Sequence, residues 1–286
     1  MKDVATRAGV ALKTVSRVVN GEPGVTPATA GRVLGVIEEL GFRRNESARL
    51  LRTGRTATLG FLAEDTAEPD QAAVRAGLED VVAERGFLLY AGSTGGDTAR
   101  EERLALALCA RRVDGMVIIP AQAPADHGYL RAEINAGVAT VFALRPPALT
   151  GHDSAAGDGG TPLGDTVVID EQGGAKAAVA HLIAQGHQRI GFLGGDQGGY
   201  RSRRLILGYT EAMSAAGLAA DQAWTALTPD DLTGAGVTAV LCESRAYTAQ
   251  ALRALAARDG APEIAVVGFG DFELADLMPQ PITVIS

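Results

Sequence analysis

Residues 2–20 read KDVATRAGVALKTVSRVVN and contain two short helical patterns separated at Gly9. The apolar residues of the first pattern lie at i, i+1 and i+4 from Val4, and those of the second lie at i, i+3 and i+4 from Val15. Each helix therefore has one apolar stripe, and the two stripes can share a small core. Gly9 supplies the backbone freedom that a tight corner between helices needs. The stretch predicts a helix-turn-helix unit, an arrangement suited to reading DNA.

A third helix is expected shortly after this pair. Thr26 can cap its N-terminus, Pro27 suits its first turn, and Gly41 ends it. One face of this helix is expected to carry Val33, Ile37 and Leu40. Three helices within about forty residues close only a small core, so the unit depends on its surroundings. The alternative to a DNA reader is a helical hairpin that packs on a larger domain.

The charges of the chain are segregated along the sequence. Residues 1–56 contain ten Lys or Arg against five Asp or Glu, a net charge of +5. The remaining 230 residues contain 16 against 29, a net charge of −13. A basic end on an acidic body suits contact with a phosphate backbone through that end alone. The charge pattern therefore favours the DNA reader over the packed hairpin.

Length and composition limit the classes of protein. The 286 residues, of which 47% are apolar, are enough for the head and one or two further domains with a buried core. The sequence has no apolar run that could span a bilayer and no signal-peptide pattern, so it predicts a cytoplasmic protein with no membrane partner. Cys109 and Cys242 are too few for a disulfide framework and are expected to be buried apolar residues. The four histidines lack metal-ligand spacing, so no metal or other cofactor is expected.

Beyond residue 57, short apolar runs alternate with helical patterns. The expected strands are 58–63, 87–91, 115–119, 139–144, 166–169, 189–193, 239–242 and 265–269. The expected helices are 71–85, 99–111, 125–136, 173–185, 203–216 and 246–258. Near-continuous apolar strands between helices predict an α/β body with doubly wound parallel sheets. Such folds bind ligands beyond the carboxyl ends of their strands.

Several short motifs are spread over the head and the body. They are KTVSRVVN (13–20), IEELGF (37–42), NESARLLRTG (45–54), RVDG (112–115), GHQRIGFLGG (186–195), VGF (267–269) and PITV (281–284). In these motifs the sequence resembles the lactose-repressor (LacI/GalR) family of bacterial transcription regulators. The resemblance implies an N-terminal all-α helix-turn-helix head joined to an α/β body like a periplasmic sugar-binding protein, with two doubly wound parallel-sheet subdomains. The implied domains are the head at 1–44, a hinge helix and linker at 45–56, and an effector-binding and dimerisation body at 57–286.

The resemblance implies a repressor that binds a near-palindromic operator in double-stranded DNA as a homodimer, with its affinity modulated by a small-molecule effector. It places Leu12, Lys13 and Arg17 against base edges in the major groove, where lysine and arginine can donate to guanine and leucine can pack on a thymine methyl group. The other head residues expected at the DNA, chiefly at phosphates, are Thr6, Thr14, Ser16 and Asn20. The alternative for Lys13 is a solvated lysine on a helix surface.

Residues 46–52 resemble the family's hinge helix, which enters the minor groove at the centre of the operator. By position the leucine that wedges between base pairs is Leu51, with Ala48 one turn before it and Asn45 at the start of the segment. The alternative is that Leu51 and its neighbour Leu50 pack onto the body. A segment of this length does not form a stable helix by itself. The hinge is therefore expected to fold only when two copies meet DNA. An effector that moves the two subdomains would change the spacing of the paired hinges and so bias DNA affinity.

The expected effector pocket departs from the family pattern. After the first strand the chain reads AEPDQ (67–71), which provides no aromatic platform for a sugar. Because arginines bind carboxylates and phosphates, a cluster of arginines favours an anionic effector over a sugar-like one. The residues expected to bind the effector are Arg145, Arg201, Arg204, Arg245 and Asp271. The alternative is an eroded pocket in an effector-independent DNA-binding regulator.

Two other classes of protein are weaker alternatives. An enzyme of the doubly wound type is disfavoured, because the sequence has no glycine-rich nucleotide loop after the first strand, no phosphate loop and no nucleophile elbow. No catalytic residue is therefore expected. A small-molecule-binding protein alone is disfavoured by the basic head. The chain ends at Ser286, where family members continue with a helix and a strand, so dimerisation of the body stays an open question at this point.

Overall fold

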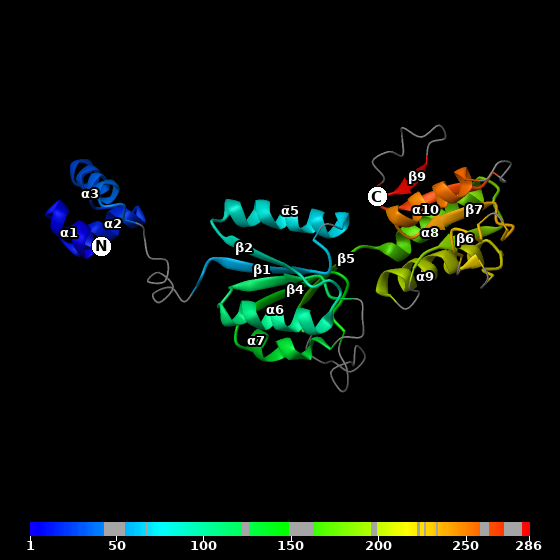
Figure 1. Cartoon of the computed structure of the whole chain (residues 1–286), viewed down its shortest axis with the longest axis horizontal. Helices are drawn as coiled ribbons and strands as arrows, with labels where there is room; N and C mark the ends of the chain where they lie inside the picture. The colour runs from blue at the N-terminus through cyan, green and yellow to red at the C-terminus, as the bar shows by residue number, and fades with distance from the viewer. Residues whose placement is uncertain are drawn as a thin grey trace. The chain divides into compact units, whose positions relative to one another are not determined.

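The computed structural model describes residues 1–42, 55–66, 68–121, 126–148, 163–195, 199–221, 224–225, 227–232, 234–257, 263–271 and 282–286. The chain divides into two compact units, which Figure 1 shows as a small helical head and a larger α/β body. The first unit contains Met1–Thr58 and Arg112–Asp114, and the second contains Leu59–Arg111 and Gly115–Ser286. Among the residues that the structure describes, no helix is both long enough and apolar enough to cross a membrane.

The head contains the predicted helix-turn-helix. Helix α1 (Lys2–Ala8) is followed by α2 (Leu12–Asn20), and Gly9 between them has a φ of +62°, a left-handed conformation that glycine adopts without strain. The core of the head is formed by Val4, Ala5, Ala8, Val15, Val33 and Val36. The apolar stripes predicted for the first two helices therefore do share one core.

The third helix of the head, α3 (Pro27–Glu39), begins as predicted. The hydroxyl of Thr26 accepts a hydrogen bond from the backbone N–H of Thr29 at 3.4 Å, and Pro27 occupies the first turn. The predicted buried face is partly wrong, because Val36 is buried and Leu40 is 45% exposed. Leu40 lies just beyond the last helical residue, so it does not follow the helical period onto the core.

The RVDG motif holds the chain where it enters the body. The carboxylate of Asp114 accepts hydrogen bonds from the backbone N–H groups of Thr56 at 3.0 Å and Ala57 at 2.9 Å. The Thr56 hydroxyl donates to the carbonyl oxygen of Arg112 at 2.9 Å. A Cβ atom at Gly115 would lie 2.8 Å from the carbonyl oxygen of Ala139, so only glycine fits there. The motif therefore combines an anchor for the incoming chain with a close contact between strands.

The first sheet of the body has the strand order β2-β1-β3-β4-β5. Its strands are β1 (Thr58–Ala63), β2 (Leu88–Ser93), β3 (Gly115–Ile118), β4 (Ala139–Leu144) and β5 (Asp165–Val168). The pairs β1–β3, β3–β4 and β4–β5 are parallel. Helix α5 (Pro69–Glu84) covers one face, and α6 (Thr98–Ala110) covers the other together with the 3-10 turn η1 (His127–Leu130) and α7 (Arg131–Asn135), as Figure 1 shows. The single helix predicted over 125–136 is therefore wrong, since a 3-10 turn and a five-residue helix occupy its described part.

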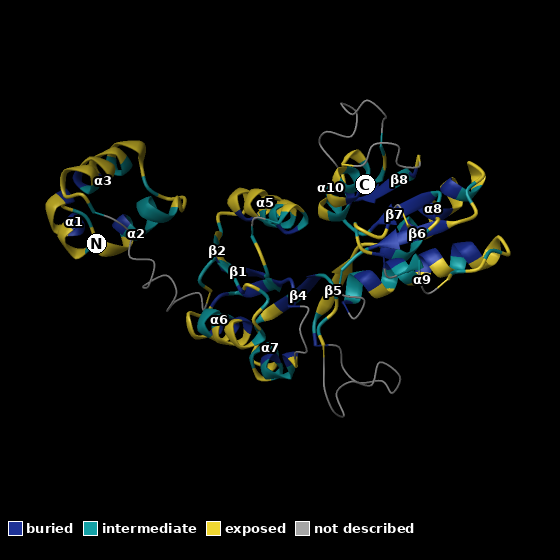
Figure 2. Ribbon diagram, turned by 45° about the vertical axis from the view of Figure 1, so that its right-hand side comes forward, coloured by how far each residue is buried: buried dark blue, intermediate teal, exposed yellow. Residues whose placement is uncertain are grey.

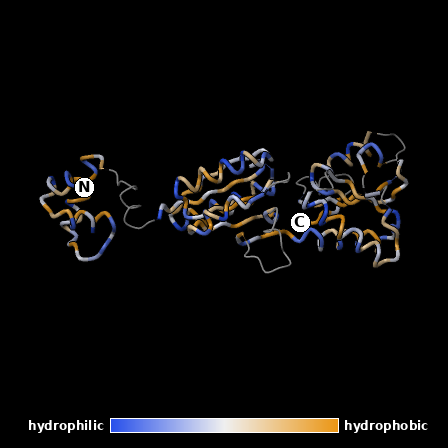
Figure 3. Tube along the Cα trace, turned by 90° about the horizontal axis from the view of Figure 1, so that it is seen from below, coloured by the Kyte–Doolittle hydropathy of each residue, from blue (hydrophilic) through white to orange (hydrophobic). Residues whose placement is uncertain are grey.

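The second sheet has the order β6-β7-β8-β9, with all pairs parallel. Its strands are β6 (Ile190–Leu193), β7 (Ala239–Cys242), β8 (Ala265–Phe269) and β9 (Thr283–Ile285). Helices α8 (Glu171–Ala184) and α9 (Tyr200–Ala215) pack on one face, and α10 (Arg245–Ala256) packs on the other. Strands β6 and β7 are buried along their whole length, as Figure 2 shows, and Figure 3 shows hydrophobic and hydrophilic residues interspersed along the trace. The predicted doubly wound α/β body is confirmed.

The two cysteines are buried, as predicted. Burial raises the pKa of the Cys109 thiol to about 11, with the charge of Glu133 as a smaller cause. Burial likewise raises the pKa of Cys242 to about 12, although a hydrogen bond with Thr248 opposes the shift. Both side chains are therefore neutral thiols that pack as small apolar residues.

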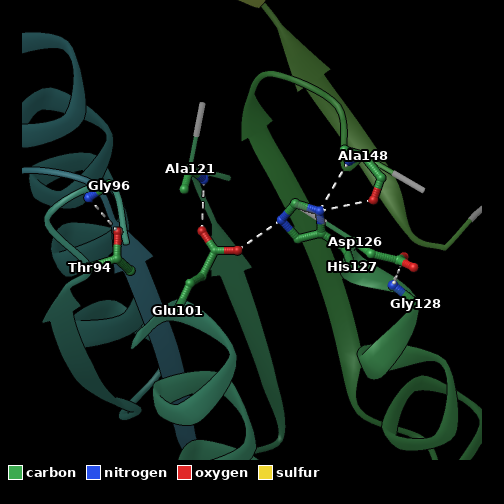
Figure 4. Close-up of polar contacts among 8 residues, drawn as sticks. All are labelled: Thr94, Gly96, Glu101, Ala121, Asp126, His127, Gly128 and Ala148. Carbon is green, nitrogen blue, oxygen red and sulfur yellow. Dashed lines mark hydrogen bonds and ion pairs between the residues drawn. The ribbon is translucent and has the colours of Figure 1, made fainter. Parts of the chain in front are cut away.

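A buried polar cluster joins α6 to the segments that follow β3 and β4 (Figure 4). One carboxylate oxygen of Glu101 lies 2.8 Å from Nε2 of His127, and both side chains are only 1% exposed. The other oxygen accepts the backbone N–H of Ala121 at 2.8 Å. Nδ1 of His127 lies 3.1 Å from both the backbone N and the carbonyl oxygen of Ala148. The cluster fixes the loops at the carboxyl edge of the first sheet, where a ligand would bind.

Candidate functional sites

The first candidate site is the exposed face of α2 in the head. Lys13 is exposed, and helical geometry places Ser16, Arg17 and Asn20 on the same face, at i+3, i+4 and i+7. Val15 points the other way and is fully buried in the core of the head. The packing of Val15 therefore decides which side of α2 is presented to solvent.

The cationic side chains of this face are Lys13 and Arg17. Within the described part of the chain, neither Lys13 nor Arg17 forms a hydrogen bond or an ion pair through its side chain. Leu12, at the start of the same helix, is 47% exposed, although it is an apolar residue of a small domain. Side chains of these types can contact base edges in a major groove, the cations through hydrogen bonds to guanine and an apolar group through a thymine methyl.

The polar residues of the same face are partly engaged within the head. The side-chain amide of Asn20 donates to the Glu22 carboxylate at 2.8 Å and to the Ser16 hydroxyl at 3.4 Å. On α1, the Thr6 hydroxyl donates to the carbonyl oxygen of Lys2 at 3.1 Å. The contact with Glu22 places an acidic group beside Asn20. The last three residues expected to contact DNA, in the hinge, lie outside the described residues: Asn45, Ala48 and Leu51.

The second candidate site is a cavity of about 430 Å³ in the body. It is lined by residues that follow β1, β4, β6 and β7 and by the first turns of α5, α8, α9 and α10. A position beyond the carboxyl ends of parallel strands is where doubly wound folds bind ligands, and the volume suits a small molecule. The acidic residues of the lining are Glu64, Asp65, Glu68, Asp70, Glu171 and Glu243. Carboxylates therefore outnumber the two arginines of the lining, Arg145 and Arg201.

Both arginines of the cavity face a carboxylate. Arg145 lies 3.5 Å from Glu64, and burial lowers the pKa of its guanidinium although Glu64 raises it. Arg201 lies 3.0 Å from Asp70, and its guanidinium sits over the ring of Phe269, 5.4 Å from the centroid. The cavity therefore has no surplus positive charge for an anionic ligand.

The structure brings only part of the predicted effector residues together. Arg145 and Arg201 line the cavity, whereas Arg204, Arg245 and Asp271 are not among its lining residues. Arg204 lies one turn further along α9 than the end that faces the cavity, and the side chain of Arg245 packs beside Gly270. Two members of the predicted arginine cluster therefore line this cavity, and the charge of Arg204 acts on Glu171 from the next turn of α9.

The acidic lining was missed by the sequence analysis, although Glu64 and Glu243 each directly follow a predicted strand. Glu243 accepts the backbone N–H of Gly195 at 2.7 Å and the hydroxyl of Ser202 at 2.6 Å. Glu68 caps α5 by accepting the backbone N–H groups of Asp70 and Gln71 at 3.0 and 3.2 Å. These contacts hold two of the carboxylates at the rim of the cavity. Aromatic groups were missed as well, since Tyr200 and Tyr247 line the cavity from α9 and α10.

Glu171 differs from the other acidic residues of the cavity. It is only 3% exposed, and within the described residues its Oε2 atom has no hydrogen-bond partner. Burial raises the pKa of its carboxyl group, while Arg201, Arg204 and Arg145 oppose the shift by their charge. An ionised carboxylate without a partner for one oxygen is costly to bury, so this site lacks one donor group.

The raised pKa of Glu171 predicts a pH dependence of stability. The folded chain binds this proton more tightly than the unfolded chain, so Glu171 costs increasing stability as pH rises through its raised pKa. Glu171→Gln is therefore expected to raise the melting temperature at about pH 8, and the gain should shrink towards about pH 5. Thermal unfolding at both pH values measures this, with Glu84→Gln, an exposed residue, as the control. A gain that is independent of pH would contradict the assignment.

Two family models match the chain. Residues 1–45 match the bacterial regulatory proteins of the lacI family, and residues 179–286 match a periplasmic binding protein-like domain. The chain is 32% identical to the HTH-type transcriptional regulator CelR of Thermobifida fusca, in an alignment that covers 99% of this chain and 85% of that protein. It is 30% identical to the ribose operon repressor of Escherichia coli K12, in an alignment that covers 100% of this chain and 87% of that repressor. These similarities extend over the head and the body together.

Solved structures show the same architecture. A complex of the transcriptional regulator CelR with cellobiose has a TM-score of 0.63 at 30% identity, with 98% of this chain and 85% of that chain covered. The lac repressor dimer bound to operator and the anti-inducer ONPF has a TM-score of 0.77 at 24% identity, with 99% of this chain and 85% of that chain covered. At that lower identity the second likeness supports the fold alone.

Proposed function

Because the chain belongs to the LacI family of bacterial regulatory proteins, we propose that it represses transcription in the cytoplasm by binding a near-palindromic operator as a homodimer. Membership of this family makes it a DNA-binding regulator rather than an enzyme. The observation that carries the proposal is that Lys13 and Arg17, on the exposed face of a helix-turn-helix, have no side-chain partner among the described residues. The basic head provides attraction to phosphates that does not depend on sequence.

In the proposed complex, α2 lies in the major groove. Lys13 and Arg17 donate to base edges, and Leu12 packs on a thymine methyl group. The residues that hold the phosphate backbone are Thr6, Thr14, Ser16 and Asn20. In the hinge, Asn45, Ala48 and Leu51 enter the minor groove, where the leucine separates two base pairs. A homodimer places two such heads on the two halves of the operator.

We further propose that a small molecule in the cavity of the body modulates DNA affinity. The structure of CelR as a complex with cellobiose supports a small-molecule ligand in a protein of this fold. The polar lining of the cavity supports it independently, because within the described residues one oxygen of the buried Glu171 has no hydrogen-bond partner, and a bound ligand would supply one. A ligand that binds one arrangement of the body more tightly shifts the protein towards that arrangement. The alternative is a regulator that works without an effector.

Selection of random duplex DNA by the purified full-length protein tests the proposal. At near-physiological salt, retained DNA is expected to contain two inverted half-sites around a centre that bends easily. Recovery of single half-sites would contradict the homodimer, and absence of any enriched sequence would contradict the operator. The selection needs no effector, so its result stands apart from any test of the cavity.

Replacement of Lys13 by alanine is expected to relax the preference at one base position in each half-site, at a cost of about 1–3 kcal/mol in binding free energy. Affinity for the selected operator and its single-base variants measures this effect. Arg32→Ala is the matched control, because Arg32 is an exposed cation of α3 and its loss removes the same charge. If both variants weaken all sequences equally, Lys13 does not read a base.

A further inference from the structure

We propose that the cavity of the body selects a ligand that carries a protonated amine, with Glu171 as its carboxylate partner. The inference rests on the proposed function of the cavity as an effector site and adds the charge of the effector. Three observations carry it: the balance of charges in the lining, the unpartnered oxygen of Glu171, and the two tyrosines of the lining.

The balance of charges favours a cation. Six carboxylates and two arginines line the cavity, and each arginine is paired with one of those carboxylates, Glu64 or Asp70. An anionic ligand could still reach the remaining N–H groups of these arginines, among them the Nε of Arg201, which has no hydrogen-bond partner in the described part of the chain. It would, however, add negative charge to an acidic cavity, which a cationic ligand does not.

The partner of that cation is Glu171. Its carboxylate is almost completely buried, lines the cavity, and has one oxygen without a hydrogen-bond partner in the described part of the chain. Glu243 and Glu68, in contrast, already accept two hydrogen bonds each from the protein. A ligand ammonium group would donate to the free oxygen in a strong charge-assisted hydrogen bond, and it would share the carboxylate with the charges of Arg201, Arg204 and Arg145. A neutral hydroxyl would supply the hydrogen bond without the charge.

The aromatic side chains of the lining also favour a ligand that carries a positive charge. Tyr200 and Tyr247 line the cavity from the first turns of α9 and α10. The face of an aromatic ring attracts a cation, and the attraction increases when water is excluded. Carboxylates and the faces of tyrosine rings both attract an ammonium group, whereas an anion is repelled by the carboxylates.

A series of probes that differ in charge tests the proposal with the full-length protein. Glucosamine, glucose and glucuronate share one ring and differ in net charge, and ethanolamine, ethylene glycol and glycolate form a smaller set for a ligand that is not a sugar. Within at least one set, isothermal titration is expected to give the amine a dissociation constant lower than that of the neutral probe by about tenfold or more. The anion is expected to bind more weakly than both.

Two variants connect this preference to Glu171. Glu171→Gln keeps the shape of the side chain and is expected to remove the preference for the amine, whereas Glu84→Gln, in an exposed position of α5, should retain it. The proposal is overturned if the anion binds best, if amine and neutral probes bind equally, if neither amine binds, or if Glu171→Gln leaves the preference unchanged. Binding of a neutral or anionic probe would still support an effector site, and operator selection tests the DNA-binding function separately.

Discussion

Replacement of Glu101 by alanine is expected to lower the free energy of unfolding by about 3–5 kcal/mol. The carboxylate is 1% exposed and contacts Nε2 of His127 and the backbone N–H of Ala121, both at 2.8 Å (Figure 4). Alanine would leave these buried polar groups without their protein partner. Chemical unfolding of the full-length protein, analysed for the transition of the body, measures the loss.

Two further variants show whether the contact itself is responsible. In Glu101→Gln the amide oxygen can still accept from Ala121, and the amide nitrogen can donate to Nε2 if the imidazole proton moves to Nδ1 and is donated to the carbonyl oxygen of Ala148. We therefore expect a clearly smaller loss than with alanine. Glu102→Ala removes the exposed neighbour and should change stability by less than about 0.5 kcal/mol. Equal losses in all three variants would contradict the role of the buried pair.

The sequence predicts the helices and strands well because their signals are local. The i, i+3 and i+4 spacing from Val15 and the left-handed Gly9 fix the helix-turn-helix. All eight strands predicted beyond residue 57 are present, since each contains a short apolar run in the sequence, even where the strand is exposed along its length, as β5 is. The predicted helix at 125–136 fails at a 3-10 turn that carries His127, and this residue contacts Glu101, 26 positions away, which no local pattern reveals.

The charge of the cavity was not predictable in the same way. A sequence shows how many arginines surround the expected cleft, but it does not show that Arg201 meets Asp70, 131 positions away, or that Arg145 meets Glu64, 81 positions away. Each pairing cancels a positive charge that the anionic prediction had counted. The signal that could have been used is the position of Glu64 and Glu243 directly after strands, where doubly wound folds place ligand-binding residues.

Replacement of Gly208 by alanine is expected to destabilise the body by about 3 kcal/mol or more. Gly208 is buried in α9 where that helix crosses α8, and a Cβ atom there would lie 2.1 Å from the carbonyl oxygen of Gln172. The clash is with backbone, so it cannot be relieved by a change of rotamer and the two helices must separate. Helix propensity alone predicts the opposite sign, because alanine is favoured over glycine in a helix interior by about 1 kcal/mol.

Gly77→Ala provides the matched control for this prediction. Gly77 is an exposed residue within α5, and a Cβ atom there would have no neighbour within 4 Å, so the same substitution should stabilise the protein by up to about 1 kcal/mol. Thermal unfolding of the two variants should therefore shift in opposite directions. Because α8 begins at Glu171 and α9 carries Arg201, separation of the two helices at Gly208 should also weaken ligand binding in the cavity. Stabilisation by Gly208→Ala would show that the close approach of α8 and α9 is not required for the fold.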